Sequence, residues 1–232
     1  AGVGGGELWG EGEEEWSVKV SSSILLDLSV DVSVLRGIAR NVSEDPSDFD
    51  SHLGLVPGFS SHGLRYLVHY TCKAMEPVGY LEVGVFYGAT FGMAMWKKKG
   101  AFVGVDSFQE FQSLHLTEPN ENRFYVNVRD QRKSVLSVMG AFGEGQAVFY
   151  EMPQETMSVE LVKEKTGGVN VFFYDGEHST DATAKGIERF APAFSDTVVL
   201  LVDDYESGEV KAGVAWGLSR ISKQYKVVEE LV

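Results

Sequence analysis

Two patterns of hydrophobic and polar residues alternate from about residue 60 to the C-terminus. Short, almost continuous apolar runs are typical of strands covered on both faces. They occur at residues 80–83, 102–105, 147–150, 169–174, 197–202 and 225–228. Apolar residues at helical spacing between these runs predict helices at about 61–75, 90–98, 130–139, 156–165, 181–190 and 208–223, the first capped by Ser61. This order predicts an α/β fold with helices on both faces of a doubly wound, mostly parallel sheet.

The first 59 residues do not show this regular alternation of strand and helix patterns. Residues 1–18 are rich in Gly and Glu but include Trp9 and Trp16, and residues 41–63 have the composition of a loop. Residues 19–40 are apolar; their first half fits a strand and their second half a helix, and the pattern does not decide between them. We therefore expect a partly flexible N-terminal arm at residues 1–59 and one domain at 60–232. The two tryptophans, if exposed, suit a homodimer.

Charge and composition narrow the class of partner. The net charge of -14 argues against a nucleic-acid substrate, because binding phosphates requires clustered Lys and Arg. No run approaches 18 uncharged apolar residues, so we expect no membrane contact. The single cysteine, Cys72, lies in an apolar helical pattern that predicts a buried thiol. One cysteine without a signal-peptide pattern fits a cytoplasmic location.

The segment around residues 80–90 indicates a nucleoside site. An apolar strand is followed by Gly84 and Gly88, and the next strand ends on Asp106. Glycines let the backbone turn tightly and approach a ligand, and an acid at the end of the next strand can accept hydrogen bonds from both ribose hydroxyls. Glu82 stands two residues before Gly84, which suits a cationic ligand better than a pyrophosphate.

Acidic residues also stand at the ends of the other central strands. They include Glu151, Asp175, Asp203 and Asp204. Neighbouring parallel strands lie about 4.8 Å apart, so the three aspartates can converge. Their mutual repulsion would be relieved by a divalent cation such as Mg²⁺, which prefers oxygen ligands. The alternative is that Asp203 and Asp204 cap the following helix.

A histidine follows the fourth central strand. His178 lies three residues after Asp175, at the start of a short loop. A histidine there can serve as a general base, a metal ligand or a supporting hydrogen-bond donor. The alternative is a histidine that only orients its loop.

Three segments together resemble the class I S-adenosylmethionine (SAM)-dependent methyltransferases of the small-molecule O-methyltransferase type. They are Leu81-Glu82-Val83-Gly84-Val85-Phe86-Tyr87-Gly88-Ala89-Thr90, Val171-Phe172-Phe173-Tyr174-Asp175-Gly176-Glu177-His178-Ser179 and Val199-Leu200-Leu201-Val202-Asp203-Asp204-Tyr205. The chain is similar to the group with a D-G-[DE]-H-S motif after strand four and to the metal-dependent macrocin- and novobiocin-type enzymes. The resemblance covers residues 60 to 228 and implies a Rossmann-like, SAM-binding domain.

The resemblance also implies which residues bind the cofactor. Glu82, Gly84 and Gly88 would hold the methionine part of SAM. Asp106 would bind the ribose, and residues around Met152 would flank the adenine. The implied cofactor-binding residues are Glu82, Gly84, Val85, Phe86, Gly88, Thr90, Asp106, Ser107, Glu151, Met152 and Asp175.

The same resemblance implies a metal site and two catalytic residues. Asp175, Asp203 and Asp204 would bind Mg²⁺, and Asp175 or His178 would lie near the acceptor hydroxyl. The expected activity is methyl transfer from SAM to a hydroxyl of a small-molecule acceptor, with a divalent cation as a candidate cofactor. Two alternatives stay open. One is a methyltransferase fold that has lost catalysis and acts as an interaction domain. The other is an NAD-dependent oxidoreductase, although the glycine spacing departs from G-x-G-x-x-G.

Overall fold

A computed structural model describes residues 23–26, 56, 58, 60–109, 128–143, 145–221 and 227–231. The strands are β1 Ser23–Leu26, β2 Val78–Val83, β3 Gly100–Asp106, β4 Ala147–Glu151, β5 Val169–Tyr174, β6 Phe194–Val202 and β7 Val227–Leu231. The helices are α2 His62–Ala74, α3 Ala89–Met95, α4 Val128–Phe142, α5 Val159–Thr166, α6 Thr180–Phe190 and α7 Gly208–Arg220, with short 3₁₀ turns at Gln154–Thr156 and Ala191–Ala193.

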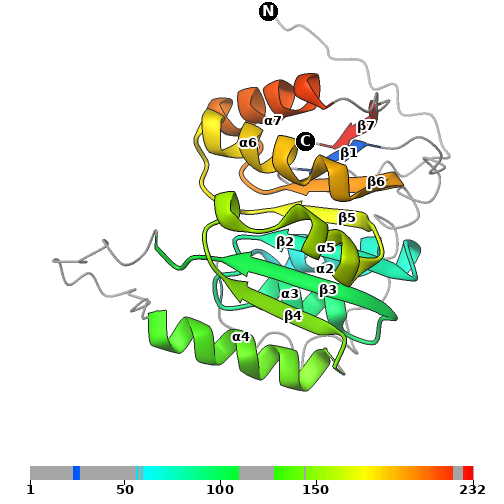
Figure 1. Ribbon diagram of the computed structural model, residues 1–232, viewed down its shortest axis with the longest axis vertical. Helices are drawn as coiled ribbons and strands as arrows, with labels where there is room; N and C mark the ends of the chain where they lie inside the picture. Colours follow the sequence, from blue (N-terminus) through cyan, green and yellow to red (C-terminus); the bar gives the residue numbers. More distant parts are fainter. Residues whose placement is uncertain are drawn as a thin grey trace, which may run out of the picture.

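Five strands form a parallel sheet in the order β4-β3-β2-β5-β6 (Figure 1). Counted along the chain from β2, this order is 3-2-1-4-5, which confirms the predicted Rossmann-like, doubly wound sheet. β1 and β7 form a separate antiparallel pair, and β1 lies against β6. The predicted strand at residues 225–228 is observed slightly later, at β7, and the undecided region 19–40 contains β1.

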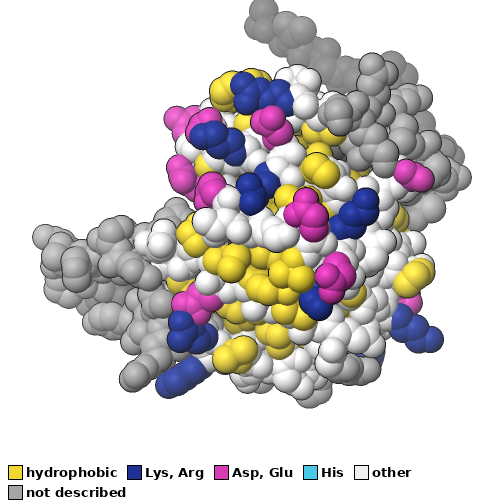
Figure 2. All heavy atoms as spheres, viewed as in Figure 1, with side chains coloured by type: hydrophobic (Ala, Val, Ile, Leu, Met, Phe, Trp, Pro, Cys, Tyr) yellow, Lys and Arg dark blue, Asp and Glu magenta, His cyan; other side chains and the backbone are white. Residues whose placement is uncertain are grey.

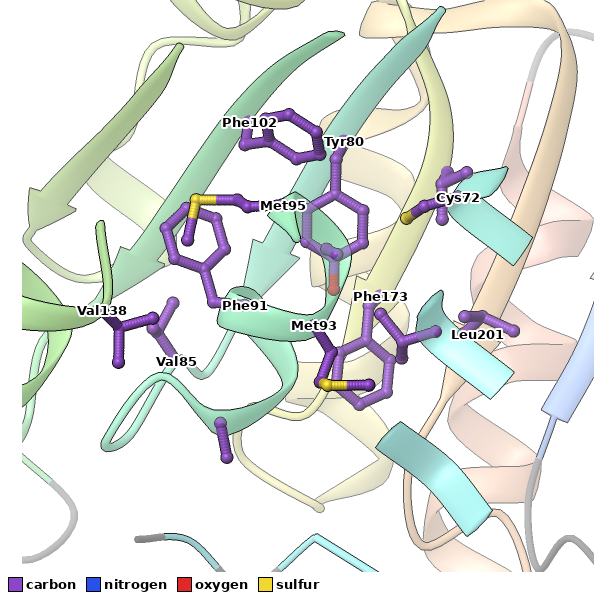
Figure 3. Packing of buried hydrophobic residues seen from close by; sticks show 14 of the residues in the cluster. Cys72, Tyr80, Val85, Phe91, Met93, Met95, Phe102, Val138, Phe173 and Leu201 are labelled. Carbon is purple, nitrogen blue, oxygen red and sulfur yellow. The ribbon is translucent and has the colours of Figure 1, made fainter. Parts of the chain in front are cut away.

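Hydrophobic side chains form two layers, one on each face of the sheet. Helices α2, α3 and α4 cover one face, and α5, α6 and α7 cover the other. Successive side chains of β2 pack in the two layers in turn: Tyr80 lies on the α3 side of the sheet, whereas Leu81 and Val83 lie in the opposite layer. Figure 3 shows Tyr80 and Phe91 packed in the first layer, with Cys72 at its side. The predicted burial of the Cys72 thiol is confirmed.

Local chemistry explains where the helices begin and end. The Ser61 hydroxyl accepts a hydrogen bond from the Leu64 N–H and starts α2, as predicted. The predicted helix at 90–98 stops at Met95, and Lys97 just beyond it has φ 52°. The predicted helix at 156–165 begins only at Val159, because Ser158 caps it after a 3₁₀ turn.

The edge strand β4 is the least covered strand of the parallel sheet. Its residues are partly exposed, and hydrophobic side chains gather on this face of the molecule over β3, β4 and α5 (Figure 2). Tyr150, Met152 and Leu161 are partly buried there against the second layer. No helix in the described part of the chain is long and apolar enough to cross a membrane. The homodimer and the cytoplasmic location stay predictions.

Part of the predicted N-terminal arm is in contact with the domain. Val56 packs in the first hydrophobic layer, and Gly58 lies against Ala89 at the start of α3. The domain boundary at residue 59 stays a prediction. Trp9 and Trp16 lie outside the described residues.

Candidate functional site

A cavity of about 620 Å³ opens at the edge of the sheet where the five parallel strands end. This is the edge at which parallel α/β sheets bind ligands, and the volume is in the range of small-molecule sites. The predicted site residues that line it are Gly84, Val85, Phe86, Thr90, Asp106, Ser107, Met152, Asp175, His178, Asp203 and Asp204. Glu82, Gly88 and Glu151 do not line it.

The loop between β2 and α3 forms one wall of the cavity. Gly84 and Gly88 both have φ 87°, and Phe86 has φ 53°, a left-handed conformation that is uncommon for a residue with a side chain. A Cβ on Gly84 would stand 1.8 Å from the carbonyl oxygen of Asp175. The protein itself therefore requires glycine at position 84, because the turn after β5 lies against it. Gly88 instead begins α3.

Asp106 is held at the end of β3 by the backbone around it. Its Oδ2 accepts a hydrogen bond from the Phe86 N–H at 2.8 Å, and its Oδ1 accepts one from the Phe108 N–H at 2.7 Å. Burial raises its pKa, and these backbone hydrogen bonds oppose that shift. A carboxylate has about four acceptor positions, so Asp106 keeps capacity for ligand hydroxyls. Asp106 also ties the glycine loop to the next strand.

Glu82 lies beneath the glycine loop rather than in the cavity. It is completely buried, and its two carboxyl oxygens accept hydrogen bonds from the hydroxyls of Tyr80 and Thr90, each at 2.6 Å. Burial is the main cause that raises the pKa of Glu82 to about 8. The predicted contact of Glu82 with the methionine part of a ligand stays a prediction. In the described chain Glu82 instead joins β2 to α3.

Glu82→Gln is expected to flatten the pH dependence of stability. The folded-state pKa lies above the ordinary value of 4.5, so the protonated group stabilises the fold at low pH, and that contribution is lost as the pH rises through about 8. The difference corresponds to about 3 to 5 kcal/mol of unfolding free energy across that window. Gln keeps the shape without the ionisation. Urea unfolding at pH 5 and pH 8.5 measures the effect.

Glu164→Gln is the matched control for that experiment, because Glu164 is exposed on α5. It is expected to leave the pH dependence unchanged. A stability difference between Glu82→Gln and the natural chain that stays constant from pH 5 to 8.5 would contradict a buried, protonated Glu82.

Glu151 points out of the cavity toward α4. Its carboxylate accepts hydrogen bonds from both Nε and Nη2 of Arg132, which lies on that helix. The ion pair is exposed, so it adds little stability. The next residue, Met152, is the one that lines the cavity.

His178 lies between two aspartates in the segment that follows β5. Its Nδ1 is 3.1 Å from Asp204 Oδ2, and its Nε2 is 3.8 Å from Asp175 Oδ1. Asp203 also lies within hydrogen-bond reach of the Asp175 side chain. Burial, together with the negative charges of Asp203 and Asp204, raises the pKa of Asp175 to about 7, and the hydrogen bond with His178 opposes that shift.

The aspartates meet at the cavity, and the Mg²⁺ site expected of Asp175, Asp203 and Asp204 stays a prediction. Among the described residues, no three His, Cys, Asp or Glu side chains are arranged to hold a metal ion. The imidazole of His178 lies next to both Asp175 and Asp204. The helix-cap alternative fails, because the N-cap residue of α7 is Ser207.

Other cavity residues carry no motif that sequence reasoning could use. Gly58 and Ser60 come from the segment interpreted as a loop. Gln154 and Glu155 come from the 3₁₀ turn after β4, and Phe108 follows Asp106. For Phe108, Gln154 and Glu155, the position after a strand end was the available signal; Gly58 and Ser60 follow no described strand directly and gave none.

Neither a protein-family model nor a curated protein matches the sequence. Among solved structures, the chain is similar to CalS11, described as a TDP-rhamnose 3'-O-methyltransferase of calicheamicin biosynthesis, at 13% identity and a TM-score of 0.49, covering 92% of this chain and 93% of that chain. It is also similar to an O-methyltransferase from Bacillus cereus in complex with SAH, at 10% identity and a TM-score of 0.44, covering 82% of this chain and 78% of that chain. Likenesses this distant do not decide an activity, which has to be argued from the cavity.

Proposed function

We propose that the chain is a SAM-dependent methyltransferase that acts on a hydroxyl oxygen of a small molecule. The observation that carries the proposal is the pairing, in one cavity, of a backbone-held Asp106 beside a glycine loop with His178 between two aspartates. The first half suits a nucleoside, and the second half suits proton transfer. Bound SAM would supply the methyl group, activated by its sulfonium.

Residues of the glycine loop and Asp106 would hold this ligand. Asp106 keeps acceptor capacity for a ribose hydroxyl beyond its backbone hydrogen bonds. Gly84, Val85 and Phe86 provide a wall in which backbone approaches the ligand closely. Met152 contributes an apolar surface next to Asp106, which suits a base.

His178 would remove the proton from the acceptor hydroxyl. A proton on Nδ1 is donated to Asp204 Oδ2, which leaves Nε2 as the basic nitrogen. Nε2 lies on the side of Asp175, whose raised pKa lets its carboxyl group both donate and accept hydrogen bonds near neutral pH. The proposal assigns proton transfer to His178, whose imidazole lies between Asp204 and Asp175.

Calorimetric titration with SAM and SAH is the direct test. We expect dissociation constants in the micromolar range and no binding of NAD. Transfer of a labelled methyl group from SAM to a panel of hydroxylated metabolites would then identify the acceptor. Absence of binding by both SAM and SAH would rule out the proposed function, whereas binding without transfer to any acceptor would favour the interaction-domain alternative.

Asp106→Asn is expected to weaken SAM binding about 10- to 100-fold. The NH₂ group of Asn cannot accept a hydrogen bond, so the backbone N–H of either Phe86 or Phe108 loses its acceptor. Calorimetry measures the change. Asp181→Asn, at an exposed aspartate in the first turn of α6, is the control and should bind SAM normally. Equal affinity of Asp106→Asn and the natural chain would remove Asp106 from the ligand site.

A further inference from the structure

Gln131 is a buried polar side chain with no hydrogen-bond partner among the described residues. It lies on α4, its exposed fraction is 0%, and neither Oε1 nor Nε2 of its amide forms a hydrogen bond. Buried side-chain amides are almost always hydrogen-bonded, and an unpaired one costs free energy. Such a group points to a partner that the ligand-free chain does not contain.

The position of Gln131 on α4 places it near the cavity. Ser134 and Val135, one turn further along, contact the glycine loop: the Ser134 hydroxyl donates to the Tyr87 carbonyl at 2.8 Å, and Val135 packs at Gly88. Residues three and four apart share one face of a helix. Gln131 is therefore on the face of α4 that meets this loop.

The direction of α4 then moves Gln131 toward the ligand edge of the sheet. α4 begins at the edge where β3 and β4 end, and runs away from it (Figure 1). With a rise of about 1.5 Å per residue, Gln131 lies about 6 Å closer to that edge than Val135. Phe108, which follows Asp106 and lines the cavity, packs on Phe149 of β4, a strand that α4 partly covers.

These placements put Gln131 near the sheet edge where β3 and β4 end. A nucleoside whose ribose is held by Asp106 would direct its base toward the residues that follow β3 and β4, which include Phe108 and Met152. An amide offers one acceptor and two donors, which match the paired acceptor and donor on the edge of adenine.

We propose that Gln131 recognises the base of the nucleoside ligand through its amide, an inference that depends on the proposed function. Gln131 does not line the cavity of the ligand-free chain. When the base binds, the Gln131 side chain, which has three rotatable bonds, rotates from its buried position toward the cavity. The chain thus keeps an unsatisfied amide that lowers the stability of the free protein and is satisfied in the complex.

Gln131→Leu tests this inference in two independent measurements. The variant removes an unpaired amide and keeps the volume, so the melting temperature of the ligand-free chain is expected to rise by about 3 °C. The dissociation constant for SAH is expected to increase about tenfold. The N6,N6-dimethyl derivative of SAH lacks the donor on the base but keeps the ring-nitrogen acceptor, so its affinity should fall clearly less than that of SAH when Gln131 is replaced by Leu.

Thr71→Val is the matched control. The Thr71 hydroxyl is also buried without a partner, but it lies near the far end of α2, away from Ser60 at the cavity. It should tolerate the change without loss of SAH affinity. Gln131→Leu with SAH affinity within twofold of the natural chain, or with equal losses for SAH and its dimethyl derivative, would overturn base recognition. If the natural chain bound neither SAM nor SAH, the proposed function itself would fail first.

Discussion

Gly84→Ala is expected to leave almost no folded protein. The new Cβ would stand 1.8 Å from the Asp175 carbonyl oxygen and 2.4 Å from its carbon. Both atoms are backbone, and the Asp175 N–H is hydrogen-bonded to the Val83 carbonyl at 2.8 Å, so the strands cannot separate locally without losing that bond. The φ of 87° adds strain for any residue with a side chain. A loss above about 4 kcal/mol would remove most of the stability of an ordinary domain.

Soluble yield, circular dichroism and urea unfolding measure this result. Gly145→Ala is the control, because Gly145 has φ 79° but an added Cβ would meet nothing within 4 Å. Gly145→Ala therefore measures the cost of the left-handed backbone conformation alone, which is about 1 to 2 kcal/mol. If Gly84→Ala were no less stable than Gly145→Ala, the close packing of the β2 and β5 turns would be wrong.

His178→Gln is expected to lower kcat about 100- to 10,000-fold, the range for loss of a general base. Gln keeps a polar side chain of similar reach but cannot take up the proton. SAM affinity should stay within about twofold, because the ribose and base are assigned to residues at the ends of β3 and β4, whereas His178 follows β5. The test measures kcat with the acceptor found by labelled-methyl transfer, and SAM binding by calorimetry.

Asp204→Asn is the comparison variant for that test, because it weakens the support of His178 without removing the imidazole. Its amide oxygen can still accept the Nδ1 proton, but it lacks the negative charge that would stabilise a protonated imidazole. We expect a smaller fall in kcat than for His178→Gln. A His178→Gln variant that keeps more than a third of the natural kcat would show that the proton leaves by another route.

The succession of strands and helices was predictable because it depends on local periodicity. Each of the five central strands was placed within a few residues, and Ser61 was identified as a helix cap from its position alone. The parallel arrangement then followed from alternation of the elements. It also brought the residues at the strand ends, including Asp106 and His178, to one cavity.

Side-chain direction and long-range pairing were not predictable. Glu82 is acidic, as the motif requires, but alternation along β2 places its side chain on the α3 side of the sheet. There it accepts hydrogen bonds from the hydroxyls of Tyr80 and Thr90. Glu151 is paired with Arg132, 19 residues away on another element. The three aspartates reach the same edge, yet their mutual geometry depends on a histidine whose side-chain direction no pattern specifies.

The contact between Gly84 and the Asp175 carbonyl constrains how this protein can evolve. Because two backbones touch there, neither the glycine loop nor the turn after β5 can be exchanged alone, and the two must be inherited together. Glu155 and Glu177, in contrast, line the same cavity with exposed side chains on turns. Under the proposed function, new acceptor preferences would therefore arise by single substitutions at those positions without change to the rest of the cavity, and directed evolution should begin there.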